Sequence, residues 1–250
     1  MIRVPFPLVA VIALAVMGIA VAADASGRQT APADAEIERL LSVRLAGEDE
    51  LRSIRATAQA GVVTLQGEVP SAGARTEAAN LAADLDGVRS IVDEMTVASV
   101  EDDRLTAARV AEQVRDYPRF TIFDHADIHV DGGVVTLFGK VTEPTKATEL
   151  ARRAARVLGV QELRNQIETL PASTSDDGLR AELADRIYRH PFLEQYGRLR
   201  HPPIHIIVER GHVTLTGAVS SQNDRQIVGS IVNGTFGVLS VENRLFVAGR

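Results

Sequence analysis

The sequence predicts an α+β fold made of three tandem copies of one small module, because a phrase and its partner recur at fixed spacing. The phrase has the form Gly-x-Val-Thr-Leu-x-Gly-x-Val and begins at Gly61, Gly133 and Gly211. A Gly-Val pair follows 26 residues later in each copy, at Gly87, Gly159 and Gly237. Matched recurrence of this kind indicates an internal repeat, which sets the domain count.

The first half of each module is expected to be a helix followed by a β-hairpin. Apolar residues recur at helical spacing ahead of the phrase: Ile37, Leu40, Leu41 and Leu45; Leu105, Ala108 and Val114; Leu179, Leu183 and Ile187. Short extended stretches then cover 54–58, 128–130 and 204–208 and end in glycine-containing turns. Turn residues between two extended runs predict a hairpin.

The phrase itself is expected to be the second strand, with Val63, Leu65, Gly67 and Val69 on the core face and Thr64 on the other. Glycine weakens a strand interior, so Gly67, Gly139 and Gly217 indicate a bulge or the close approach of a helix. These glycines are therefore interpreted as packing residues.

A second helix and a last strand complete the module. The helix stripe is expected to contain Ala74, Ala78, Leu81 and Leu85; Leu150, Ala154, Val157 and Leu158; Ile227, Val228 and Ile231. We expect each helix to stop at the glycine of the Gly-Val pair, which can adopt a left-handed cap conformation. Each module then reads α-β-β-α-β, a three-stranded sheet with two helices on one face.

The N-terminus reads as an export signal. Residues 8–20 form an unbroken apolar run after Arg3, and Ala20-Val-Ala22 fits a small-residue cleavage site. We interpret 1–23 as a cleaved signal peptide and 24–33 as a flexible leader. The alternative is an uncleaved anchor, but the run is shorter than the roughly 20 residues that span a bilayer.

The chain of 250 residues contains no cysteine. Disulfides, thiolate metal sites, a cysteine nucleophile and a lipidated N-terminal cysteine are therefore excluded. Export without disulfides favours the periplasm of a bacterial envelope, and the protein is not expected to be a lipoprotein.

Charge is distributed unevenly over the three expected repeats. The net charge is −6 over residues 34–100, +1 over 104–170 and +3 over 178–250. The acidic balance argues against nucleic acid as a partner. The later repeats retain the capacity for local attraction to anionic surfaces.

The repeated phrase, the following helix, and the Gly-Val pair before a strand with Asn165 or Asn243 resemble the BON domain, named for bacterial osmotically induced and nodulation-related envelope proteins. The first copy departs from the pattern, with Asp93 at the asparagine position. The resemblance implies an exported module that binds phospholipid surfaces or envelope proteins, without catalysis, cofactor or small-molecule substrate.

Two groups of side chains are candidates for binding. Arg152, Arg153 and Arg156 are expected on the outer face of one helix, where anionic headgroups could be held; the alternative is a solvated face with Glu149 paired to Arg153. Arg186, Arg189, Arg198 and Arg200 form a second basic group, near the aromatic residues Tyr188, Phe192 and Tyr196. These aromatics, with Tyr117, Phe120 and Phe123, suit a membrane boundary or a partner surface, or else they pack over their own module.

No pattern for catalysis or metal binding is found. His201 and His205 are four residues apart, but Pro202 and Pro203 between them exclude the helix that would bring them onto one face. The sequence therefore favours a non-enzymatic protein that binds anionic phospholipid. The alternative is a chaperone-like or scaffold protein for envelope proteins, which would depend on Phe192 and Tyr196.

Overall fold

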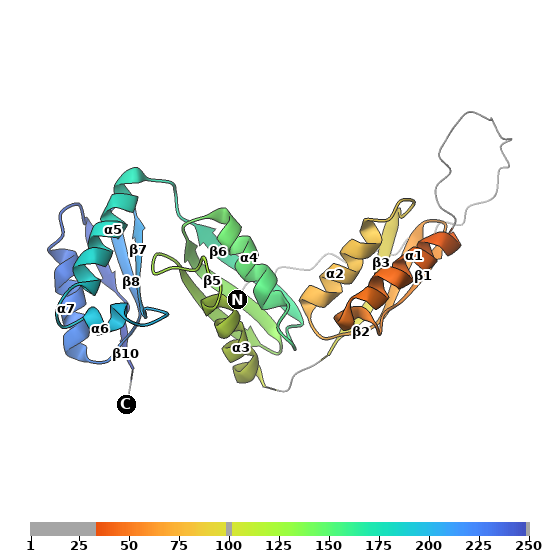
Figure 1. Cartoon of the computed structure of the whole chain (residues 1–250), viewed down its shortest axis with the longest axis horizontal. Helices are drawn as coiled ribbons and strands as arrows, with labels where there is room; N and C mark the ends of the chain where they lie inside the picture. Colours follow the sequence, from red (N-terminus) through yellow and green to blue (C-terminus); the bar gives the residue numbers. More distant parts are fainter. Residues whose placement is uncertain (1–33, 99–101, 249–250) are drawn as a thin grey trace, which may run out of the picture. The chain divides into compact units, whose positions relative to one another are not determined.

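The computed structural model describes residues 34–98 and 102–248. The predicted signal peptide and leader lie outside these residues. These residues form three modules that follow one another along the chain, each with two long helices and a sheet, as can be followed in Figure 1. We describe each module by itself.

The first module contains α1 (Asp34–Gly47), the short 3-10 helix η1 (Asp49–Leu51), β1 (Arg55–Gln59), β2 (Val62–Val69), α2 (Ala72–Ala83) and β3 (Ser90–Val97). The second contains α3 (Asp103–Arg115), β4 (His125–Asp131), β5 (Val134–Val141), α4 (Pro144–Ala155) and β6 (Glu162–Thr169). The third contains α5 (Thr174–Tyr188), α6 (Glu194–Gly197), β7 (Ile204–Glu209), β8 (His212–Val219), α7 (Gln222–Asn233), β9 (Ser240–Asn243) and β10 (Phe246–Val247).

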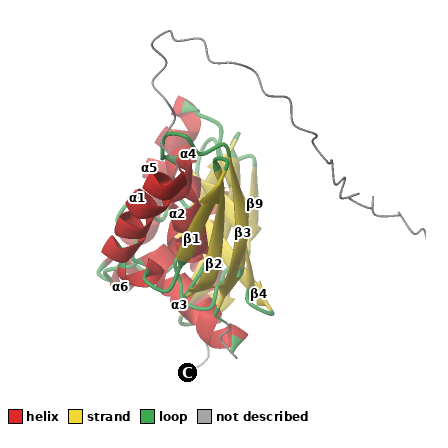
Figure 2. Ribbon diagram, turned by 90° about the vertical axis from the view of Figure 1, so that its right-hand side faces the viewer, coloured by secondary structure: helices red, strands yellow, loops and turns green. Residues whose placement is uncertain are grey.

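The strand carrying the repeated phrase is central in every sheet. It pairs antiparallel with the strand before it and parallel with the last strand of the module. In the third module the last strand is interrupted, and β9 and β10 both pair with β8. The helices lie on one side of the strands, as Figure 2 shows. The predicted α+β class and the α-β-β-α-β module are confirmed.

Each core lies between the two helices and the inner face of the sheet. The central strands supply Val63, Leu65 and Val69 in the first module, and their equivalents in the other two are buried as well. Three of the residues expected in the helix stripes, Leu105, Ala108 and Leu158, are exposed instead. Leu105 is 43% exposed because α3 buries Thr106, Val110 and Val114, and Leu158 is 46% exposed because α4 has already ended at Ala155.

A carboxylate at the start of each first helix holds the hairpin turn. Asp34 accepts hydrogen bonds from the backbone N–H groups of Ala60 and Gly61 at 2.7 and 3.0 Å. Asp103 accepts from Gly132 and Gly133, and Asp176 from Arg210 and Gly211, at nearly the same distances. Both turn residues have positive φ in all three hairpins, as a two-residue type I′ turn requires. We call this contact the carboxylate clamp.

The glycines inside the central strands allow two backbones to approach closely. A Cβ on Gly139 would lie 2.0 Å from the carbonyl oxygen of His125, and one on Gly217 would lie 1.9 Å from that of Pro203. The approaching group is therefore the start of the neighbouring strand, and the suggestion that a helix approaches here was wrong. The packing role itself is retained, because no other residue fits at this distance.

The second helices end earlier than predicted. They stop at Ala83, Ala155 and Asn233, four residues before Gly87, Gly159 and Gly237. The expectation that each helix stops at the glycine was wrong. These glycines lie instead in the turn that leads to the last strand, with φ of 90°, 87° and 90°.

The asparagine of the last strand ties that strand to the second helix. Asn165 donates from its side-chain amide to the carbonyl oxygen of Ala147 at 3.2 Å, and Asn243 donates to that of Arg225 at 3.0 Å. In the first module Asp93 has no N–H to donate, and its carboxylate accepts from Nε of Arg75 at 2.7 Å. Arg75 occupies the same helix position as Ala147 and Arg225, so an ion pair replaces the amide bond.

Candidate functional site

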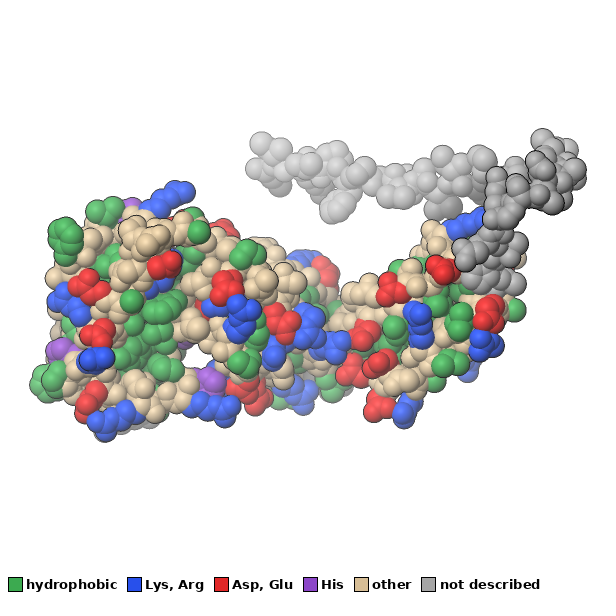
Figure 3. All heavy atoms as spheres, turned by 45° about the horizontal axis from the view of Figure 1, so that its top comes forward, with side chains coloured by type: hydrophobic (Ala, Val, Ile, Leu, Met, Phe, Trp, Pro, Cys, Tyr) green, Lys and Arg blue, Asp and Glu red, His purple; other side chains and the backbone are tan. Residues whose placement is uncertain are grey.

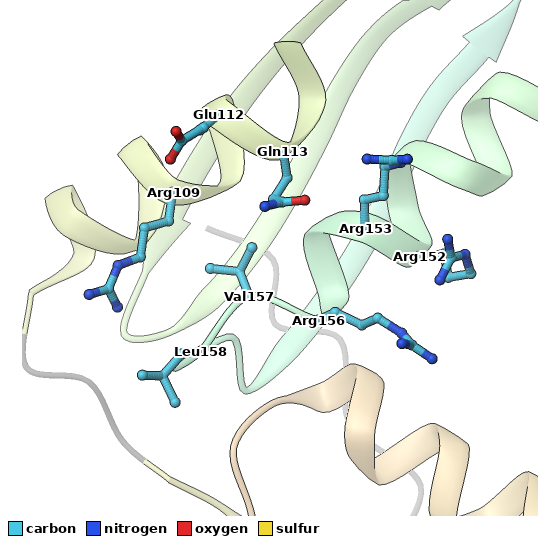
Figure 4. A pocket seen from close by; sticks show the side chains of 8 residues that line it. All are labelled: Arg109, Glu112, Gln113, Arg152, Arg153, Arg156, Val157 and Leu158. Atoms are coloured by element: carbon cyan, nitrogen blue, oxygen red, sulfur yellow. The ribbon is translucent and has the colours of Figure 1, made fainter. Parts of the chain in front are cut away.

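Four arginines surround a cavity of about 420 Å³ in the second module. Arg152, Arg153 and Arg156 come from the end of α4, and Arg109 comes from α3, which packs beside it. Figure 4 shows that Arg109 points away from Arg152 and Arg156, with Val157 and Leu158 between them. Glu112 and Gln113 complete the lining. We call this cavity the arginine cavity.

Within the second module, one carboxylate neutralises part of the arginine charge. Glu149 lies 2.7 Å from Nη2 of Arg152 and 3.0 Å from Nε of Arg153. The hydrogen bond with Arg152 lowers the pKa of Glu149 and raises that of Arg152, so both groups are held in their charged forms. The predicted Glu149–Arg153 pair is present, and it coexists with the cluster of arginines on the cavity wall.

Arg153 is the most constrained of these cations. Its guanidinium lies 5.0 Å from the ring centroid of Tyr117, a cation–π geometry. Tyr117 itself is 8% exposed and belongs to the core of the module. Arg152 and Arg156 keep about half of their side-chain surface exposed, at 53% and 46%. They are therefore better placed than Arg153 to meet a ligand.

The cavity combines cationic groups with apolar surface. Val157 is buried at its base, and Leu158 is exposed at its edge. Guanidinium groups bind phosphate oxygens through fixed pairs of N–H donors. A site of this composition suits an anion that carries an apolar part, and it contains no arrangement of nucleophile and base.

Arg109 was not predicted as a member of the site. The apolar stripe predicted for α3 contained Leu105 and Ala108, which are exposed in the structure. The predicted buried face was therefore wrong, and Arg109 was not expected on the face beside α4. The spacing of Thr106, Val110 and Val114, which are the residues that α3 buries, is the signal that would have found it.

The second candidate group lies at the end of α5, in the third module. Arg186 is 3.5 Å from Glu182, and Arg189 is 2.6 Å from Asp185. Each of these arginines thus has a carboxylate partner one helical turn away. Arg189 is 81% exposed and Arg186 is 43% exposed.

The aromatic candidates divide into buried and exposed residues. The hydroxyl of Tyr188 donates to the carbonyl oxygen of Ile204 at 2.5 Å, and burial raises its pKa. Tyr196 is 4% exposed; its hydroxyl donates to Asp224 and accepts from the N–H of Ser220, both at 2.7 Å. Phe120 and Phe123 are half-buried. Phe192 presents 68% of its surface and lies against the ring of His190.

Among the residues that the structure describes, no group of three metal-ligating side chains comes together. Over the same residues, no helix combines the length and apolar character needed to cross a membrane.

Comparisons with known proteins give one strong match. The family model described as the BON domain matches residues 33–99, 102–171 and 175–249. No curated protein matches the chain.

Solved structures resemble the chain weakly. The C-terminal domain of CdsD, titled the structural protein of the Type III secretion system of Chlamydia trachomatis, is 16% identical; the match covers 86% of this chain and 96% of that one, with a TM-score of 0.25. The PrgH periplasmic domain is 12% identical over 79% of this chain and 96% of that one, with a TM-score of 0.23. A second PrgH fragment, from S. typhimurium, is 12% identical over 83% and 100%, with a TM-score of 0.21.

The repeated phrase, the helix-and-sheet plan of each module and the three family matches agree. The chain belongs to the BON domain family and carries three tandem copies of the domain.

Proposed function

We propose that this protein is a non-enzymatic envelope protein that associates with anionic phospholipid surfaces. The single observation that carries the proposal is the arginine cavity, where α3 and α4 bring four guanidinium groups next to apolar surface. The headgroup phosphate would meet Arg152 and Arg156, which are the more exposed pair.

The cellular location of the protein and the biological process that it serves are also part of this proposal. The apolar N-terminal run favours export to the periplasm through a cleaved signal peptide. Membership of the BON family supports an envelope role, either in transport or in maintenance under osmotic or envelope stress.

The proposal is tested by co-sedimentation of the chain from Asp24 onwards with phosphatidylglycerol and phosphatidylcholine vesicles. Binding is expected to be selective for phosphatidylglycerol and to weaken as salt is raised. A basic residue near an anionic surface contributes about 1 kcal/mol. The double variant Arg152→Gln/Arg156→Gln should therefore bind about 30-fold more weakly, since about 1.4 kcal/mol corresponds to a factor of ten.

A second variant is expected to strengthen vesicle binding instead of weakening it. Glu149→Gln removes the carboxylate that neutralises Arg152 and Arg153, so it should strengthen vesicle binding about fivefold. Arg55→Gln, on β1 of the first module, is the control for a single lost charge and should change binding little. Equal binding to both lipids, or unchanged binding in the double arginine variant, would contradict the proposal.

A second candidate function is the capture of other envelope proteins, and the observation that favours it is Phe192. An aromatic ring that is 68% exposed, three residues after Arg189 in the sequence, resembles the anchors found in protein interfaces. In that case Phe192→Ala would abolish capture of a periplasmic protein while vesicle binding stayed unchanged. Tyr196, the other residue predicted for this role, is 4% exposed and belongs to the core of the third module, so Phe192 alone would make this contact.

A further inference from the structure

The loop between α7 and β9 exposes two large apolar side chains at one end of the third module. Phe236 is 95% exposed and Leu239 is 72% exposed. The loop comprises residues 234–239, with the sequence Gly-Thr-Phe-Gly-Val-Leu, and contains no charged residue. We call it the α7–β9 tip. Hydrophobic side chains project from the surface of the third module in Figure 3.

The first module shows that the fold requires no apolar residue at either position, and the second module has one at the first position only. Phe236 precedes the recurring glycine, as Asp86 and Leu158 do; Leu239 is matched by Arg89 and Gln161. The loop backbone is nevertheless the same in all three copies. The N–H of residue 89, 161 or 239 donates to the carbonyl oxygen of the hairpin-turn glycine at 2.8 to 2.9 Å. The apolar pair is therefore a property of the third module.

The tip is held by bonds that leave the two side chains outside. Thr235 is 4% exposed, and its hydroxyl donates to the carbonyl oxygen of Ile231 at 2.8 Å. The N–H of Leu239 donates to the carbonyl oxygen of Gly211 at 2.8 Å. Gly237, at a φ of 90°, makes the turn between them. A fixed loop presents apolar surface without a further ordering cost on binding.

The neighbouring hairpin turn adds a cation. Arg210 immediately precedes Gly211, the residue that Leu239 contacts through the backbone. Two projecting apolar groups, with a basic residue on the hairpin turn to which the tip is bonded, match the boundary between acyl chains and anionic headgroups. A fluid bilayer accepts projecting side chains without a complementary pocket, whereas a protein partner would have to supply one.

We propose that the α7–β9 tip inserts Phe236 and Leu239 into the acyl-chain boundary of an anionic phospholipid bilayer. The inference rests on the proposed function. It adds an apolar contact with the membrane to the charged contact that the arginine cavity would make. Because this contact buries apolar surface, it persists at a salt concentration that screens the arginines.

The chain contains no tryptophan, so Phe236→Trp places a sole tryptophan reporter in the tip. On phosphatidylglycerol vesicles its emission should shift to shorter wavelength, and lipids brominated near the headgroup end of the acyl chain should quench it. Asp86→Trp, at the equivalent position of the first module, is the matched control and should keep the emission of a water-exposed indole.

Binding measurements with Phe236→Ser/Leu239→Ser complete the test. The double variant should lose about tenfold in affinity at low salt, and the residual binding that wild type keeps at high salt should disappear. Vesicle binding with no spectral shift in the Phe236→Trp variant and no loss in the serine variant would overturn the inference and leave the proposed function standing. No binding to phosphatidylglycerol by any form would overturn both.

Discussion

Asp93 shows how one residue change is compensated within a repeated fold. In the second and third modules an asparagine donates to a helix carbonyl, whereas in the first an aspartate accepts from the side chain of Arg75. The strand–helix tie is preserved, although its chemistry has changed from an amide hydrogen bond to an ion pair. A second hydrogen bond is common to all three modules. The side-chain Oδ1 of residue 93, 165 or 243 accepts from the backbone N–H two residues later.

This exchange predicts a rescue. Arg75→Ala should lower the stability of the first module by up to about 1 kcal/mol, since the pair is about a third exposed on each side. Arg75→Ala/Asp93→Asn should recover the loss, because the new pair reproduces Ala147 and Asn165 of the second module. Thermal unfolding of the full chain measures both variants. A double variant less stable than the single one would show that the asparagine geometry does not transfer.

Also at the scale of residues, the sequence predicted three of the four arginines that line the arginine cavity, those at the end of α4, but not the fourth, which lies on α3. Arg152, Arg153 and Arg156 are placed by their spacing around Leu150 and Ala154, which are buried as expected. Arg109 depends on how α3 packs beside α4, and a helix with few large apolar residues leaves that register ambiguous. The burial of Tyr196 is likewise a tertiary effect, because its hydroxyl partners Asp224 and Ser220 lie more than twenty residues further along the chain.

The carboxylate clamp operates at the scale of elements, because it joins the first helix to the hairpin. It escaped the repeat analysis since its spacing varies: Asp34 reaches Gly61, Asp103 reaches Gly133 and Asp176 reaches Gly211. Loops of different length between helix and hairpin absorb the difference. The hairpins were predicted from their glycines, whereas the clamp required knowledge of which helix end lies over which turn.

The clamp predicts a stability that depends on pH. Burial raises the pKa of Asp176, but hydrogen bonds from Arg210 and Gly211 outweigh it, and the net pKa is lowered. A lowered pKa in the folded state means that the contribution is present above the unfolded pKa, near 4, and is lost as pH falls through the folded pKa. Asp176→Ala should therefore destabilise the third module by about 1–3 kcal/mol at pH 7 and by less below pH 4.

Hydrogen exchange at the amides of Arg210 and Gly211 measures this effect, since both lose their acceptor in the variant. Asp185→Ala on the same helix is the control, because it removes an exposed pair with Arg189 and should cost less than about 1 kcal/mol. Equal protection of the two amides in wild type and Asp176→Ala at pH 7 would refute the role of the clamp.

At the scale of the whole molecule, three copies of one fold carry three different surfaces. The first module has a net charge of −6 over residues 34–100 and polar or charged residues, Asp86 and Arg89, at its loop tip. The second has the arginine cavity, and the third has basic residues at the end of α5 and the apolar tip. The core residues recur and the surface residues do not, so the copies share a scaffold, and the proposed lipid contacts fall on the second and third of them.

Division of binding between linked modules predicts multiplicative losses. Only residues 170–173 separate β6 from α5, so a second module that binds the same vesicle does so at a high effective concentration. Arg152→Gln/Arg156→Gln and Arg186→Gln/Arg189→Gln should each weaken binding to phosphatidylglycerol vesicles, the second less because Glu182 and Asp185 already neutralise its arginines. The quadruple variant should lose the product of the two factors. Arg55→Gln/Arg244→Gln, with the same number of lost charges as one pair, serves as the control. If the α5 pair has no effect alone or in combination, lipid contact by charge is confined to the second module, and the third contributes through its apolar tip alone.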